Sequence, residues 1–148
     1  MSTPTVIFVL PDKLGGVLNI VDGLLRYRSA DAFRYGAVLT HNPLSSDTRF
    51  GGTVPADWQR TVEFRSPVEN FVSVLRRLRR AIPDGEGVLV ANDLLELAMA
   101  EAFDTPKTVV QILHGDHDYY YDLAARHQGA IDVFVTYGRV MQRTLQAR

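Results

Sequence analysis

Short runs of apolar, mostly β-branched residues recur along this chain and alternate with longer stretches that have helical apolar spacing. This alternation is typical of a parallel sheet with helices on both faces. The predicted strands are 6–10, 36–40, 61–64, 88–91, 109–113 and 133–136. The predicted helices are 17–28, 68–82, 94–103, 119–127 and 139–148. Right-handed connections then favour an α/β fold with a Rossmann-like, doubly wound sheet in the order 3-2-1-4-5-6.

The first two predicted helices each carry an apolar stripe that we expect to pack on the sheet. The first stripe consists of Val17, Ile20, Val21, Leu24 and Leu25. The second consists of Val68, Phe71, Val72, Leu75, Leu78 and Ile82. Ser66 is expected to cap the second helix, with Pro67 at its first position. The arginines at 76, 77, 79 and 80 then form a solvated face, with contact to an anionic membrane surface as the alternative.

Composition narrows the possible chemistry. The 148 residues contain no cysteine, which excludes disulfides, zinc-cysteine sites and a thiol nucleophile. The formal net charge of -1 provides no domain-wide basic field for nucleic acid. Residues 41–59 hold glycine and proline with little periodicity and predict a long surface loop. We expect one domain over 1–148 and, with neither a signal peptide nor a membrane span in the sequence, a cytoplasmic location.

A loop with two glycines follows the first predicted strand. Gly15 and Gly16 allow positive φ and a close approach of the backbone to a ligand. The free amides of the next helix's first turn favour an anion such as phosphate, and Lys13 can add positive charge. The alternative is a tight turn that binds nothing.

A second polar loop, Leu113–Asp118, follows the fifth predicted strand. His114 is placed beside the crevice, where an imidazole can exchange a proton near neutral pH, or it is a structural histidine bonded to backbone. His114, Asp116 and His117 also include ligand types for a divalent ion. Against a metal site, Asp118 suits the N-cap of the next helix.

Other polar side chains are expected at the same edge of the sheet. Asn92 and Asp93 follow the fourth strand and contact a sugar hydroxyl, or Asp93 caps the helix that starts at Leu94. Three consecutive tyrosines, 119–121, offer rings for stacking on a ligand, although at least one must face the core.

Three segments in this order resemble the N-terminal domain of GT-B glycosyltransferases, above all the retaining group called family 4 (glycosyl transferases group 1). They are 6–17, 110–115 and 131–139, and the likeness extends over essentially the whole chain. In that family the Gly-Gly loop approaches the donor diphosphate, which implies this role for Gly15 and Gly16. The histidine after the fifth strand lies by the transferred sugar, which implies a catalytic role for His114. The resemblance leaves acceptor or sugar contacts to Lys13, Asn19, Asn92, Asp93, Asp116 and His117.

The resemblance implies an enzyme that moves a sugar from a nucleotide-diphosphate sugar to a hydroxyl of a carbohydrate, lipid or small molecule, with retained configuration. It implies no further cofactor, no metal and no nucleic acid partner. The family's second Rossmann-like domain, which binds most of the nucleotide sugar, has no counterpart here. We therefore expect an N-terminal part that is inactive alone, with the C-terminal domain as its main partner and peripheral membrane contact as an additional option.

The chain departs from the family pattern at two strand ends. Ala91-Asn92-Asp93 stands where many relatives have a histidine-containing sequence, and Tyr137-Gly138 stands where a serine often follows the strand. Two other classes of function stay open. One is a non-catalytic α/β binding module, and the other is a metal-dependent hydrolase built on His114, Asp116 and His117, which predicts bound zinc or manganese.

Overall fold

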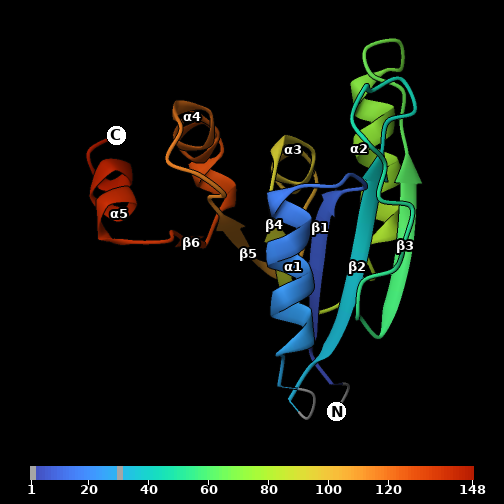
Figure 1. The fold of residues 1–148 in the computed structure, drawn as a ribbon, viewed down its shortest axis with the longest axis horizontal. Coiled ribbons are helices and arrows are strands. Elements are labelled where there is room, and N and C mark those ends of the chain that lie inside the picture. The colour runs from blue at the N-terminus through green and yellow to red at the C-terminus, as the bar shows by residue number, and fades with distance from the viewer. Residues whose placement is uncertain (1–2, 30–31) are drawn as a thin grey trace.

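The computed structural model describes residues 3–29 and 32–148. It contains a six-stranded sheet in the order β3-β2-β1-β4-β5-β6, and every neighbouring pair is parallel (Figure 1). The strands are β1 Thr5–Pro11, β2 Arg34–His41, β3 Trp58–Glu63, β4 Gly87–Ala91, β5 Lys107–Ile112 and β6 Val133–Val135. The predicted fold class and strand order are confirmed.

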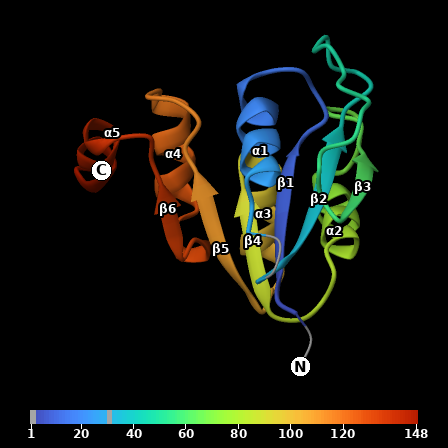
Figure 2. The same ribbon diagram turned by 60° about the horizontal axis from the view of Figure 1, so that its bottom comes forward.

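Helices cover both faces of this sheet (Figures 1 and 2). They are α1 Gly16–Arg26, α2 Phe71–Ala81, α3 Leu94–Ala102, α4 Asp118–Arg126 and α5 Arg139–Gln146, with a short 3₁₀ turn at Gln128–Ala130. α1 packs through one apolar cluster on one face, and α2, α3 and α4 pack through a second cluster on the other. The continuous apolar character of the strands follows from this burial on both sides.

The two predicted helix stripes need correction. On α1 the buried residues are Leu18, Val21 and Leu25, whereas Ile20 and Leu24 are exposed. α2 begins at Phe71 and not at Pro67, because Asn70 is its N-cap and accepts a hydrogen bond from the N–H of Ser73 at 3.1 Å. The shorter α2 buries its residues 74, 75 and 78, while 68, 71 and 72 are exposed.

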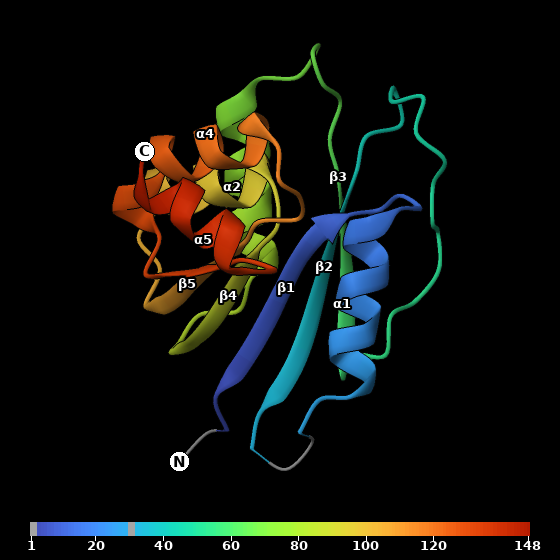
Figure 3. The ribbon, with the colours of Figure 1, turned by 60° about the vertical axis from the view of Figure 1, so that its left-hand side comes forward.

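The predicted long loop connects β2 to β3 and runs beside α1 (Figure 3). Val54 anchors it in the apolar cluster under α1, where it is 6% exposed. Its first half passes the carboxyl end of β1, where Arg49 forms an isolated bridge with Lys13. The loop therefore forms one wall at the edge of the sheet where ligands bind in doubly wound folds. Across the described ranges, no helix has the length and apolar character needed to cross a membrane.

Candidate functional site

His114 lies in a hydrogen-bonded network where β4, β5 and β6 end. Its Nε2 lies 2.5 Å from Oδ1 of Asn92, which follows β4 directly. Its Nδ1 lies 2.8 Å from the hydroxyl of Tyr137, which follows β6. The rings of Tyr120 and Tyr137 pack near the imidazole, with centroid separations of 6.3 and 6.2 Å. Three strand ends thus hold one imidazole between two polar partners and two aromatic rings.

Asn92 determines which nitrogen of His114 carries the proton. The Asn92 side chain is fully buried, and its Nδ2 donates to the carbonyl of Val9 at 2.7 Å. Its Oδ1 is therefore directed at His114 and can only accept a hydrogen bond. Because Nε2 must donate to this oxygen, Nδ1 keeps a lone pair, which accepts from the Tyr137 hydroxyl. The basic nitrogen of the neutral imidazole consequently faces Tyr137.

The surroundings of His114 favour its neutral form. Burial lowers the pKa of His114 below 6.5 because desolvation penalises the imidazolium, and the Asp93 carboxylate opposes this shift more weakly. At pH 7 the imidazole is therefore ready to accept a proton. Burial also raises the pKa of Tyr137, so that its phenol stays protonated and donates to Nδ1.

Asp93 and Glu96 form a capping box at the start of α3, which confirms the capping alternative for Asp93. Glu96 accepts hydrogen bonds from the N–H groups of Asn92 and Asp93, at 2.8 and 2.7 Å. Its side chain is buried, and desolvation together with the charge of Asp93 raises the pKa of Glu96 to about 8. Asp93 also accepts from the Tyr119 hydroxyl, and burial with this bond holds the pKa of Tyr119 well above its usual value.

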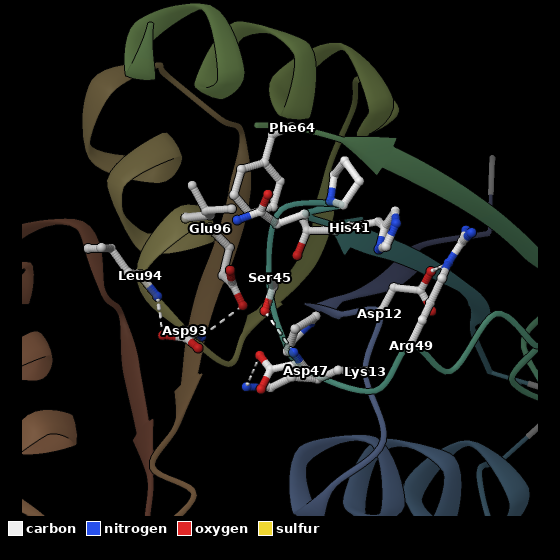
Figure 4. A pocket seen from close by; sticks show the side chains of 15 residues that line it. Asp12, Lys13, His41, Ser45, Asp47, Arg49, Phe64, Asp93, Leu94 and Glu96 are labelled. Carbon is white, nitrogen blue, oxygen red and sulfur yellow. Dashed lines mark hydrogen bonds and ion pairs between the residues drawn. The ribbon is translucent and has the colours of Figure 1, made fainter. Parts of the chain in front are cut away.

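A cavity of about 480 Å³ lies over the carboxyl ends of β1, β2 and β4, between the β2–β3 loop and the start of α3 (Figure 4). Its polar lining residues are Asp12, Lys13, Thr40, His41, Asn42, Ser45, Asp47, Arg49, Asp93 and Glu96. Phe64, Leu94 and Leu95 contribute apolar surface. Asp93 lines the cavity, and its charge acts on His114, so the His114 network lies near one wall of the cavity, although His114, Asn92 and Tyr137 do not line it.

The charges in the cavity are largely paired. Lys13 binds Asp47 at 3.2 Å, and Arg49 binds the buried carboxylate of Asp12 at 2.8 Å. Asp93 forms no ion pair with any residue that the structure describes. Both lining cations have carboxylate partners, and of the two remaining carboxyl groups Glu96 keeps its proton at pH 7, which leaves the charge of Asp93. The cavity therefore suits an uncharged or cationic polar molecule better than an anion.

The structure brings only some of the predicted site residues together. Asn92, Asp93 and His114 lie in the network, and Lys13 lines the adjoining cavity. Outside the cavity lining are Gly15, Gly16, Asn19, Asp116 and His117. Gly15 is the N-cap of α1 with a φ of 153°, a conformation that requires glycine. The ligand contacts of these five residues stay predictions.

The metal-site alternative has no matching geometry within residues 3–29 and 32–148, where no group of three or more His, Asp or Glu side chains is placed to hold an ion. Both nitrogens of His114 have other partners, and Asp116 accepts from the Tyr121 hydroxyl at 2.5 Å. His117 occupies the N-cap position of α4, so the predicted cap, Asp118, is instead the first residue of the helix.

Three parts of the site were not predicted from the sequence. Tyr137 is forty-five residues from Asn92, and nothing local indicates that it donates to His114. Glu96 could have been found, because Asp93-x-x-Glu96 has the spacing of a capping box before an apolar run. The cavity wall from the β2–β3 loop carries no motif, so Asp47 and Arg49 were predicted only as loop residues.

Comparisons with known proteins identify no family for this chain. No protein-family model and no curated protein matches it. A solved structure that resembles it is an isochorismatase-like hydrolase from Alkaliphilus metalliredigens. The two are 15% identical, the match covers 98% of this chain and 96% of that chain, and the TM-score is 0.47. At this identity and TM-score, the likeness transfers no activity to this chain.

The glycosyltransferase interpretation is wrong on these findings. No GT-B or nucleotide-sugar family model matches, and the structural likeness over nearly the whole chain is to a hydrolase. The resemblance was carried by buried strands and a glycine turn, which a doubly wound sheet needs whatever it binds. We therefore no longer expect this chain to take part in hexosyl transfer.

Proposed function

We propose that this chain binds a small, hydroxyl-bearing molecule that extends from the cavity past Asp93 to His114, and that His114 acts on it as a general base. The observation that carries the proposal is the Asn92–His114–Tyr137 chain of hydrogen bonds, which leaves the lone pair on Nδ1. The Tyr137 hydroxyl marks the position from which an O–H group donates to that lone pair. Because both cations of the cavity already have carboxylate partners, the cavity disfavours an anionic ligand.

In the proposed reaction, an O–H group of the ligand, or of a water beside it, takes the place of the Tyr137 hydroxyl. Its proton moves to Nδ1 of His114 as its oxygen attacks the carbonyl carbon of an ester, whose C=O π electrons move onto the carbonyl oxygen. When the C=O bond forms again, the ester C–O bond breaks, and the leaving alkoxide takes the proton from Nδ1 and departs as an alcohol. Asn92 keeps accepting from Nε2 and prevents the ring from turning. Asp93, whose charge already favours the imidazolium, stabilises it as it forms.

His114→Gln is expected to lower turnover by roughly 100-fold, because proton transfer by a positioned base contributes on this order. The probes are glycerol, ribose and myo-inositol for binding, followed in NMR spectra, and their acetate esters for turnover, followed as acetate release. Ligand binding should change far less than turnover, because the cavity lining does not include His114.

Tyr27→Phe is the matched control, because Tyr27 is 90% exposed on the surface. Equal ester turnover in the His114→Gln variant and the unaltered protein would remove His114 from the mechanism. Binding of the polyols with no turnover of any ester would instead establish the non-catalytic binding module.

A further inference from the structure

A second groove, of about 980 Å³, lies between β3 and α2. β3 forms the edge of the sheet opposite to β5 and β6, where the His114 network lies (Figure 1). β3 stands at one end of the sheet order, and among residues 3–29 and 32–148 it pairs only with β2. The outer side of β3 is therefore an open sheet edge except at Glu63, whose carbonyl accepts from Arg77. An open edge is the feature to which extended peptides add as a further strand.

Thr61 supplies the open hydrogen-bonding groups of this edge. The N–H of Phe64 donates to His41 in β2 at 2.9 Å. Because successive residues of a strand direct their backbone groups to alternate sides, those of Thr61 point away from β2. Thr61 is exposed and lines the groove. An incoming strand can therefore pair with it without disturbing the β2–β3 ladder.

Two arginines shape the groove. Arg60 donates from β3 to the carbonyl of Ala81 at 2.8 Å, which ties the strand to the end of α2. Arg77 donates from α2 to the carbonyl of Glu63 at 2.6 Å and forms an ion pair with Glu69. These bonds cross from helix to strand at two points, so the walls of the groove are preorganised.

Two further arginines supply charge. Arg80 forms no ion pair in the part of the chain that the structure describes, and Arg65 approaches Glu63 only at 3.9 Å. Four arginines and two glutamates line the groove, so its side chains carry a net charge of +2. Val68, 75% exposed, adds an apolar contact at one end.

We infer that this groove binds an extended, acidic segment of a partner protein, which adds to β3 as a seventh strand. The open edge supplies backbone hydrogen bonds, and the unpaired arginine charge selects acidic side chains. This occupant explains both the edge and the charge, whereas an anionic membrane surface would use the charge alone.

The test measures fluorescence anisotropy of a labelled peptide of alternating Glu and Val added to the full chain. The matched peptide of alternating Glu and Pro has the same charge but cannot form strand hydrogen bonds. We expect the Glu-Val peptide to bind and the Glu-Pro peptide to bind at least roughly tenfold more weakly.

Two variants locate the site. Arg80→Glu removes the unpaired charge, and Thr61→Pro removes the outward N–H while leaving the β2 ladder intact. Each should weaken binding of the Glu-Val peptide by roughly tenfold, with circular dichroism to check that the variant is folded. Arg126→Glu, an exposed charge reversal on α4, should leave binding unchanged.

Equal affinity for the two peptides, or an equal loss in Arg126→Glu, would overturn the proposal in favour of unspecific charge attraction. Sedimentation with phosphatidylserine vesicles tests the membrane surface, and analytical ultracentrifugation tests a second copy of the chain. Vesicle binding or dimerisation that Arg80→Glu abolishes, in the absence of peptide binding, would likewise overturn it.

Discussion

Glu96→Gln is expected to stabilise the protein at pH 9 relative to the unaltered chain and to change its stability much less at pH 5. Glutamine has the same shape, and its carbonyl can accept both backbone N–H groups that Glu96 now binds. Its advantage at high pH arises because it never ionises, whereas Glu96 is a buried carboxyl whose pKa is raised from 4.5 to about 8.

The direction of the pH dependence follows from proton linkage. Between pH 4.5 and about 8 the folded protein keeps a proton on Glu96 that the unfolded chain has lost. The stability that Glu96 contributes is fully present below pH 4.5 and falls by up to about 1.4 kcal/mol for each pH unit across this window. Above pH 8 the loss is complete.

Urea unfolding of the unaltered protein and Glu96→Gln at pH 5, 7 and 9 measures this difference directly. Glu86→Gln is the control, because Glu86 is exposed in the turn before β4 and should follow the unaltered protein. Parallel pH curves for the unaltered protein and Glu96→Gln would contradict the buried, protonated carboxyl.

Asn92→Ala is expected to destabilise the protein by about 2 to 3 kcal/mol. It should also allow His114 to populate both neutral tautomers, because the acceptor that holds the proton on Nε2 is lost. The loss of stability has two sources: the Val9 carbonyl loses its buried donor, and Nε2 of His114 loses its acceptor. A buried polar group left without a partner costs on the order of 1–3 kcal/mol. The small void left by the amide adds to this.

Urea unfolding gives the stability change, and nitrogen-15 NMR of the histidine rings gives the tautomer. In the unaltered protein at pH 7, His114 should carry its proton on Nε2. In Asn92→Ala the two tautomers should both be populated, because nothing else in the described network requires a donor at Nε2.

Tyr137→Phe removes the second hydrogen-bond partner of His114 and leaves the first, Asn92, in place. Tyr137 is 51% exposed, so its substitution should change stability by less than about 0.5 kcal/mol. Because Asn92 still accepts from Nε2, the tautomer should be retained. If both tautomers are populated in Tyr137→Phe but not in Asn92→Ala, then the assignment of donor and acceptor at the two nitrogens of His114 is wrong.

The amino-acid pattern by itself determined the elements, their order in the sheet and the edge at which polar residues gather. Short continuous apolar runs alternate with longer stretches of helical apolar spacing, which distinguishes the strands from the helices. The handedness of parallel connections then leaves few arrangements. Asn92, Asp93 and His114 could be placed at one edge because each lies within two residues of the end of a strand. The same local features also suggested the wrong family. Buried strands and a glycine turn are needed by any doubly wound sheet and do not identify a reaction.

Only the tertiary structure determined which side chains form hydrogen bonds with each other at that edge. The proton on Nε2 of His114 depends on Asn92 and Val9, which are eighty-three residues apart in the chain. Tyr137 reaches Nδ1 only because β6 lies beside β5. The exposure of residues 68, 71 and 72 depends on where α2 begins. Periodicity constrains only the few residues within one element, whereas tautomers, raised pKa values and open sheet edges arise from contacts between elements that no local pattern encodes.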